Sequence, residues 1–332
     1  MKRGIVKTMV GIMVALSLAL GISTSFIAFA GDASTWPGRK TIEIVLGAKA
    51  GGDTDAQIRR FAKYLEKELG ASIAIVNMPG SSATIAGQYV HDADPDGYTM
   101  MALNPESFAP YYFGITEYNS SDYAIAGIGA IDDTLIFCTR KESPYPTLKS
   151  LVEAAKANPG KIELPAMQPG GYSYMSALLF QAALGVEFNL TDIASNGEKI
   201  VQLLAGKVDV IGNQYWFVQD YVEKGDFIVY CVMADERNPA FPDIPTLKEL
   251  GYDIGITSVP KYFYFAFPKG TDKAIVDKFS AALKAVVESP EYVADATKAM
   301  TTPFYLNADD ATAYIADQEV NVYKKLAKMM GF

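Results

Sequence analysis

Short apolar runs alternate with amphipathic segments from residue 42 onward, and this alternation predicts strands followed by helices. Ile42–Leu46 is apolar and β-branched, which is typical of a buried strand. The next segment repeats apolar residues at helical spacing until Gly70, where a helix is expected to stop. Further strands are expected at 73–76, 98–103, 123–130, 134–139, 162–166, 208–211 and 227–233, and helices at 85–90, 147–158, 172–184, 199–204 and in three final segments, the last near 310–329. The pattern predicts an α/β fold with mostly parallel sheets flanked by helices.

The strand–helix rhythm restarts after residue 139, which suggests two similar α/β units. We expect a discontinuous first domain at residues 31–135 and 262–332, and a second domain at 136–261. Each unit carries a glycine turn directly after a strand, at 50–55 and at 168–171. Ligands of open α/β sheets bind at the carboxyl ends of strands, so we expect a ligand cleft between the two lobes.

The first glycine turn is a candidate anion site. Its two glycines let the backbone approach a ligand closely, and the helix that follows points unpaired N–H groups at the turn. The candidate ligand-binding residues here are Lys49, Ala50, Gly51, Gly52, Asp53, Thr54 and Asp55.

Several of these side chains have two interpretations. Asp53 or Thr54 could simply cap the helix, or Thr54 or Asp55 could orient a water on the ligand. Asp53 would repel a bound carboxylate unless it points outward or meets an amine, so an amine- or amide-bearing ligand is of interest. Lys49 is either a solvated cation or a countercharge for the ligand, and in the second case Lys49→Ala weakens anion binding at least tenfold, as expected of a charge-assisted hydrogen bond.

The remaining candidates lie around the second turn and in other loops, where hydroxyl and amide side chains could bind a polar ligand. They are Asn104, Gln168, Gly170, Tyr172, Ser173, Asn196 and Asn213. Tyr172, like Tyr174 and the aromatic residues at 215–216 and 262–264, serves either in ordinary packing or as a stacking wall for a flat carboxylate.

The amino-terminal 30 residues read as a signal peptide: three cations, an apolar run and a small-x-small site ending at Ala30. We therefore expect an exported chain that is cleaved after about Ala30. Loss of the three cations changes the formal net charge from −9 to −12, which argues against nucleic acid and anionic membrane as partners.

Cys138 and Cys231 lie in apolar runs and form either one disulfide or two separate buried thiols.

An ordered set of motifs identifies a family. It comprises Trp36-Pro37, the 50–55 loop, Asn77-Met78-Pro79-Gly80, Pro95-Asp96-Gly97-Tyr98-Thr99, and the segments at 157–161, 204–209, 242–246 and 268–271. Together they span nearly the whole chain after residue 30, which resembles the solute-binding proteins of tripartite tricarboxylate transporters, the Bug family. The resemblance implies a two-lobed periplasmic-binding-protein fold of type II and a monomer without cofactor or metal. Backbone amides of the two glycine loops would hold a small carboxylate, which the protein delivers to membrane transporter subunits.

The sequence departs from the family pattern at the expected ligand site. Lys49 stands where proline is frequent, Asp53 where glycine or serine is usual, and the second loop reads Gln-Pro-Gly-Gly-Tyr-Ser-Tyr at 168–174. The identity of the ligand therefore stays open.

Two other functions are compatible with the fold. A sensor that presents a solute to a membrane kinase would have the same sequence features as a transport protein. A hydrolase is disfavoured because His91, the only histidine, is expected at a helix end, and the chain has no Gly-x-Ser-x-Gly, Cys-x-x-Cys or His-Glu-x-x-His motif.

Overall fold

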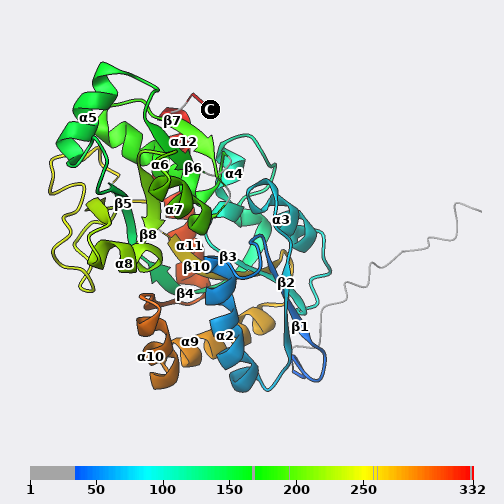
Figure 1. Ribbon diagram of the computed structural model, residues 1–332. Helices are drawn as coiled ribbons and strands as arrows, with labels where there is room; N and C mark the ends of the chain where they lie inside the picture. Colours follow the sequence, from blue (N-terminus) through cyan, green and yellow to red (C-terminus); the bar gives the residue numbers. More distant parts are fainter. Residues whose placement is uncertain (1–33, 167–168, 194, 257, 260, 330) are drawn as a thin grey trace, which may run out of the picture.

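The structure is a computed structural model that describes residues 34–166, 169–193, 195–256, 258–259, 261–329 and 331–332 (Figure 1). The predicted signal peptide with its cleavage after about Ala30 lies outside the described residues, as does the candidate Gln168. Strands and helices alternate along the described chain and form an α/β fold, as the sequence predicts.

One six-stranded sheet contains strands from both ends of the chain. Its order is β11-β4-β10-β3-β1-β2, formed in turn by Thr302–Leu306, Tyr123–Asp132, Lys261–Pro268, Thr99–Leu103, Ile42–Leu46 and Ile73–Asn77. β1 pairs in parallel with β2 and β3, whereas β10 runs antiparallel to β3 and β4. We call this sheet and the helices on it the large-sheet lobe (residues 42–132 and 261–318).

Helices bury both faces of the large sheet. Along β10, Phe263, Phe265 and Phe267 enter one apolar cluster, while Tyr262 and Tyr264 enter the cluster on the opposite face. The first face is covered by α2 (Asp53–Leu69), α9 (Lys273–Glu288) and α10 (Pro290–Lys298), and the second by α3 (Thr84–His91) and α11 (Ala308–Gln318). Figure 1 shows α2, α9 and α10 together on one side of the sheet. Burial on both faces explains why β10 is almost continuously apolar.

The sequence of α2 accounts for its position and its ends. Ile58, Phe61 and Leu65 repeat at helical spacing and are completely buried against the sheet. Asp53 lies in the first turn, where the helix dipole favours a negative charge. The helix ends at Gly70, whose φ of 63° is left-handed and suits glycine.

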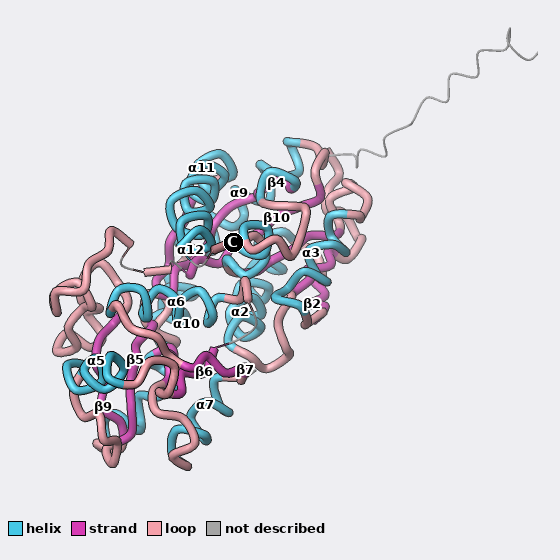
Figure 2. The backbone as a smooth tube through the Cα atoms, turned by 90° about the horizontal axis from the view of Figure 1, so that it is seen from above, coloured by secondary structure: helices cyan, strands magenta, loops and turns pink. Residues whose placement is uncertain are grey.

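Two smaller sheets hold the strands between residues 135 and 232. The antiparallel sheet β8-β5-β9 consists of Ile211–Gln214, Leu135–Arg140 and Phe227–Val232, and the parallel pair β6–β7 of Glu163–Ala166 and Asn189–Asp192. Around them lie α5 (Leu148–Ala157), α6 (Tyr172–Leu184), α7 (Asn196–Leu204) and α8 (Tyr215–Glu223). We call this part the small-sheet lobe (residues 135–232). Figure 2 shows the elements of the two lobes as two groups.

The chain crosses between the lobes along β4, which leads into β5, and returns along β10. Because the two strands cross in opposite senses and lie side by side, they pair antiparallel, with Lys261 opposite Asp132. Among the strands of the described residues, parallel pairing is therefore limited to β1–β2, β1–β3 and β6–β7, with one isolated parallel bridge between Val232 and Thr246, although the sequence pattern predicts it for most of the sheets.

The carboxyl-terminal end of the chain also reaches the small-sheet lobe. A π-helical turn at Glu319–Tyr323 leads into α12 (Lys324–Met329), and Tyr323 and Leu326 pack into the core around α6. The domain boundaries at 31–135 with 262–332 and at 136–261 stay a prediction. Shorter helical turns are Ser81–Ala83, Pro105–Ser107, α4 (Ala109–Tyr112) and Ser120–Asp122.

One predicted strand is displaced. The strand expected at 208–211 begins only at Ile211, because the backbone N–H groups of Asp209 and Val210 both donate to the carbonyl of Glu163, the first residue of β6. The sequence pattern also does not predict β7, β10, α8 or β11; β7 reads Asn-Leu-Thr-Asp and has a single apolar residue.

The two cysteines do not form a disulfide. Cys138 on β5 and Cys231 on β9 are both free and buried. Phe137, not Cys138, lies opposite Cys231, and neighbouring residues of a strand point to opposite faces. Of the two possibilities that the sequence leaves open, the structure shows separate buried thiols.

Candidate ligand-binding site

A cavity of about 440 Å³ lies between the two lobes. The large-sheet lobe contributes the turn after β1, the turn at 79–83, Asn104, Glu106 and Lys261, and the small-sheet lobe contributes Tyr172, Ser173, Lys199, Gln214 and Phe217, among others. The lining turns follow strands β1, β2 and β3, in agreement with the rule for open α/β sheets. The volume lies within the range of roughly 300–1,000 Å³ that is usual for small-molecule sites.

The turn after β1 is held in shape by Asp55, which points away from the cavity lining. Its carboxylate accepts a hydrogen bond from the N–H of Gly51 at 2.9 Å, from Arg59 Nε at 2.9 Å and from Asn77 Nδ2 at 2.9 Å. Gly51 has a φ of 75°, which favours glycine. Burial alone would raise the pKa of Asp55, but the hydrogen bonds from these three partners lower it. Asp55 therefore shapes the turn as a carboxylate.

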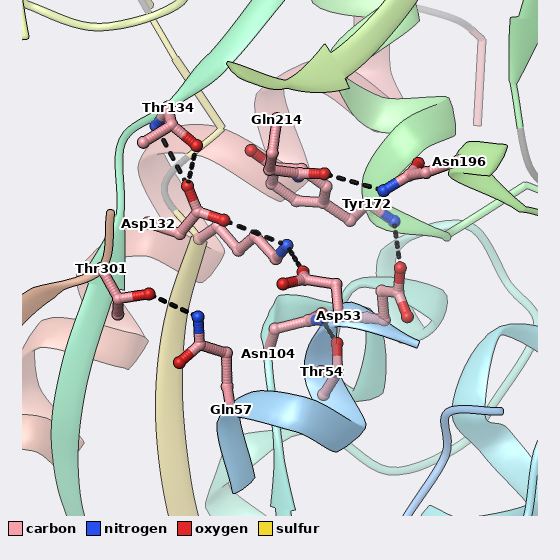
Figure 3. Close-up of polar contacts among 12 residues, drawn as sticks. Asp53, Thr54, Gln57, Asn104, Asp132, Thr134, Tyr172, Asn196, Gln214 and Thr301 are labelled. Atoms are coloured by element: carbon pink, nitrogen blue, oxygen red, sulfur yellow. Dashed lines mark hydrogen bonds and ion pairs between the residues drawn. The ribbon is translucent and has the colours of Figure 1, made fainter. Parts of the chain in front are cut away.

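The start of α2 faces this turn without a side-chain cap. The N-cap residue is Gly52, and no side chain of the described residues caps the first N–H groups of the helix. The interpretation of Asp53 or Thr54 as a cap is therefore wrong, since both side chains have other partners. The Thr54 hydroxyl accepts a hydrogen bond from Asn104 Nδ2 at 3.0 Å (Figure 3). Uncapped N–H groups and the helix dipole favour an anion at this point.

Asp53 belongs to a buried ion cluster. The Lys261 ammonium pairs with one carboxylate oxygen of Asp53 and, at 3.3 Å, with Asp132 (Figure 3). The side chains of Lys261, Asp53 and Asp132 are only 4%, 9% and 1% exposed. The second oxygen of Asp132 accepts hydrogen bonds from the N–H and the hydroxyl of Thr134 at 3.0 and 2.6 Å.

Two carboxylates share one cation in this cluster, and this sharing explains the directions in which the pKa values of Lys261 and Asp53 are shifted. Burial lowers the pKa of Lys261, but the charges of Asp53 and Asp132 outweigh it and raise the pKa above its ordinary value. Burial, supported by the charge of Asp132, raises the pKa of Asp53 despite the pairing with Lys261.

Glu106 connects the two lobes across the cavity. Its Oε1 accepts a hydrogen bond from the N–H of Tyr172, the first residue of α6, at 3.2 Å. Asn104 fixes this loop, because its Oδ1 accepts from the N–H of Glu106 at 3.0 Å. Burial raises the pKa of Glu106. A second contact between the lobes joins the Ser82 hydroxyl to the carbonyl of Pro169 at 2.9 Å.

Lys199 is a second buried cation in the cavity wall. Its ammonium donates to the Ser173 hydroxyl at 2.5 Å and to the carbonyl of Gly212 at 3.4 Å. The residue is 1% exposed. Burial lowers its pKa from 10.5 to about 8, although the charge of Glu106 opposes the shift. A bound anion would stabilise the charged form of this lysine.

The sequence profile described as "Tripartite tricarboxylate transporter family receptor" matches residues 57–332 of this chain. The chain belongs to this family. The predicted resemblance to the tripartite tricarboxylate and Bug receptors is therefore confirmed, and the family is one of solute-binding receptors rather than of enzymes.

The receptor is similar to known proteins over most of its length. It is 31% identical to "UPF0065 protein in gbd 5'region" of Cupriavidus necator in an alignment of 285 residues, and this alignment covers 84% of each of the two chains. The structure of the periplasmic binding protein BugD superposes with a TM-score of 0.73 at 25% identity and covers 89% of the receptor and 97% of BugD. Protein Rpa4515 of Rhodopseudomonas palustris, solved with adipate, has a TM-score of 0.77 at 22% identity, covering 89% and 98%. The predicted fold class is confirmed.

Most candidate residues that the sequence singles out line the cavity. These are Lys49, Gly51, Gly52, Asp53, Thr54, Asn104, Tyr172, Ser173 and Asn196. Ala50, Asp55, Gly170 and Asn213 are not among the lining residues. Gly170 packs against Pro110, and Asn213 is buried behind Asn196, to whose carbonyl it donates at 3.3 Å. The binding roles of all these residues stay a prediction.

Sequence reasoning missed the charged residues Glu106, Lys199, Lys261 and Asp132. Lys199 precedes Ile200 on the apolar face of α7, and Lys261 begins a strand that is otherwise apolar. A charge at a position that the periodicity assigns to the interior is the signal that could have drawn attention to both lysines.

The remaining aromatic and titratable candidates lie elsewhere. Tyr262 and Tyr264 are buried in the core of the large-sheet lobe, so of the aromatic residues weighed from the sequence only Tyr172 lines the cavity. His91 ends α3 and contacts Asp92, as expected of a solvated helix end. Within the described ranges no cluster of three metal-ligating side chains occurs, and no helix there is long and apolar enough to span a membrane.

Proposed function

We propose that this receptor captures a small organic carboxylate in the cavity between its lobes and delivers it to a tripartite tricarboxylate-type membrane transporter. The observation that supports this most strongly is the start of α2, which meets the cavity with its N–H groups uncapped. Lys199, buried in the opposite wall, offers the matching positive charge. The net charge of −9 repels anions at long range, so affinity has to come from these local groups.

The comparisons support a carboxylate as the ligand. The family is named for tricarboxylate transport, and Rpa4515, which shares the fold, was solved with adipate. A cavity of about 440 Å³ accommodates a solute of this size.

Binding is tested by thermal shift and calorimetry on the mature chain with succinate, glutarate, adipate and citrate, and with succinamide as the uncharged control. A ligand that binds only the native state raises the melting temperature as its concentration increases. We expect at least one carboxylate to do so while succinamide does not. If succinamide shifts the melting temperature and no carboxylate does, the proposal is wrong.

A matched pair of lysine variants locates the anion. Lys199→Gln keeps a donor for Ser173 but removes the charge, and we expect the affinity for the best carboxylate to fall by about ten- to a hundredfold. Lys207→Gln makes the same change at an exposed residue that does not line the cavity, and should leave the affinity unchanged. Equal effects of the two variants would place the anion elsewhere.

Delivery is tested separately from binding. We expect cells that lack the receptor to lose high-affinity uptake of the radiolabelled carboxylate and to regain it with the wild-type chain but not with Lys199→Gln. Normal uptake together with a lost transcriptional response to the solute would instead indicate the sensor function.

A further inference from the structure

One oxygen of Asp53 has no partner in the wall of the cavity. Its Oδ1 is buried and receives no hydrogen bond from the described residues, and the side chain is 9% exposed. Asp53 is one of the residues that line the cavity, next to Thr54 at the start of α2 (Figure 3). A buried carboxylate oxygen without a donor costs free energy, so a ligand that donates a hydrogen bond to it would bind more tightly than one that cannot.

Lys261 does not satisfy this oxygen. Its ammonium is already shared between the other oxygen of Asp53 and the carboxylate of Asp132. The remaining buried lysine, Lys199, donates to Ser173 and Gly212 in the small-sheet lobe.

Glu106 presents a second carboxylate to the same cavity. One of its oxygens accepts from the N–H of Tyr172, and the described residues make no further hydrogen bond to its side chain. Asn104 holds the two carboxylates in place together, because it donates to Thr54 beside Asp53 and accepts from the N–H of Glu106. The two acceptors are therefore parts of one built wall.

The buried charges around the cavity sum to a negative value. Asp53, Glu106 and Asp132 carry three negative charges when ionised, against two positive charges on Lys199 and Lys261. The cation in the wall that carries Asp53 and Glu106 is Lys261, which Asp53 already shares with Asp132, so a second carboxylate of a ligand would meet a net negative charge there.

We propose that Asp53 and Glu106 form a subsite for a protonated amine, and that the preferred ligand of this receptor is an amino carboxylate rather than a dicarboxylate. The proposal rests on the proposed function for the carboxylate half of the ligand, which the uncapped start of α2 and Lys199 attract. The amine half is bound by the unpartnered oxygen of Asp53 and by Glu106. Burial raises the pKa of both carboxyl groups, so a bound ammonium would supply the positive charge that stabilises their ionised forms.

The test compares ligands in which one carboxylate is replaced by an ammonium group on the same methylene chain. The pairs are succinate and β-alanine, glutarate and 4-aminobutyrate, and adipate and 5-aminopentanoate, measured by calorimetry on the full mature chain. For the chain length that binds best, we expect the amino carboxylate to bind at least about tenfold more tightly than its dicarboxylate partner, as expected of a charge-assisted hydrogen bond. Tighter binding of the dicarboxylate in every pair would overturn the proposal and leave the proposed function intact.

The variant Asp53→Asn tests whether the preference for the amino carboxylate over the dicarboxylate arises at this subsite. It removes the charge at nearly constant shape, and we expect the ratio of the two affinities to fall by at least about tenfold, with the amino carboxylate weakened and the dicarboxylate strengthened. Asp243→Asn makes the same change at an exposed residue that does not line the cavity, and should alter the ratio by less than about threefold, because solvent screens its charge. An unchanged ratio in Asp53→Asn would contradict the assignment.

Two further measurements keep the outcomes distinct. If Asp53→Asn does not fold, as judged by circular dichroism, Glu106→Gln provides the same ratio test, because Lys261 retains both of its carboxylate partners there. If neither ligand of any pair binds and citrate also fails, the proposed function itself is wrong, and this inference falls with it.

Discussion

Replacement of Lys261 by methionine removes the only cation that the structure places within ion-pair distance of Asp53 and Asp132 in the described chain. Methionine fills a similar volume, so the change isolates the charge. All three side chains are at least nine-tenths buried, and solvent therefore screens their interaction only weakly. Removal of one partner from a buried ion pair destabilises proteins by about 3–5 kcal/mol, because the remaining charge is left uncompensated. Since two carboxylates lose their partner here, we expect a loss near the upper end of that range, about 5 kcal/mol.

The assay is urea denaturation followed by circular dichroism, with the free energy of unfolding extrapolated to water. Lys63→Met is the matched control, since the ion pair of Lys63 with Asp295 lies at the surface, and we expect no measurable change of the unfolding midpoint. The double variant Lys261→Met with Asp132→Asn should recover part of the loss, because it leaves one uncompensated carboxylate instead of two.

The pH dependence of the loss has a definite sign. The pKa of Asp53 is already raised in the folded protein, and loss of Lys261 raises it further. A carboxyl group whose folded pKa exceeds its unfolded pKa stabilises the fold while it is protonated, and this stabilisation disappears as pH rises through the folded pKa. The deficit of Lys261→Met should therefore be smaller at pH 5 than at pH 7.5. A deficit below about 1 kcal/mol at pH 7.5, or one that grows toward pH 5, would refute the reasoning.

Three further predictions concern the cavity. The affinity for a carboxylate should fall by up to about tenfold per pH unit above about pH 8, where Lys199 loses its proton, and calorimetry should show a flatter profile for Lys199→Gln. Lys49 is exposed at the cavity, so solvent screening should limit the effect of Lys49→Ala on the dissociation constant to less than about fivefold, below the tenfold that the sequence suggests. A Cβ on Gly47 would lie 2.2 Å from that of Ala83, so Gly47→Ala should lower the free energy of unfolding by about 1–3 kcal/mol in urea titrations.

The sequence predicts the elements that carry most of the fold because their patterns are local. β1 and α6 occupy the expected residues, since an apolar β-branched run and a long apolar segment after a glycine turn each leave few alternatives. The displaced strand at 211–214 shows the limit. The two residues before it, Asp209 and Val210, donate to the carbonyl of Glu163 and so lie outside the strand, and no pattern within residues 208–211 reports on a segment that distant.

The sequence alone predicts the backbone turns of the candidate site, but not its buried charged residues. The glycine turns follow from local composition, whereas the cluster of Asp53, Asp132 and Lys261 depends on the order of the strands in the sheet. Lys261 begins an apolar run and reads like a solvated residue at a strand end. Glu106 stands between Pro105 and Ser107 and reads like part of a polar turn. Only the pairing of β4 with β10 shows that the lysine is buried opposite a carboxylate.

The charge arrangement at the cavity follows from the way the chain crosses between the lobes. β4 ends at Asp132 and β10 begins at Lys261, and the antiparallel register sets these residues opposite each other where both crossings enter the small-sheet lobe. A buried carboxylate at this crossing requires a cation, and the lysine that supplies it also reaches Asp53. One ammonium group serves two carboxylates, and one oxygen of Asp53, a residue that lines the cavity, stays without a donor from the described residues. The topology that joins the lobes therefore also determines which charge the cavity wall presents to a ligand.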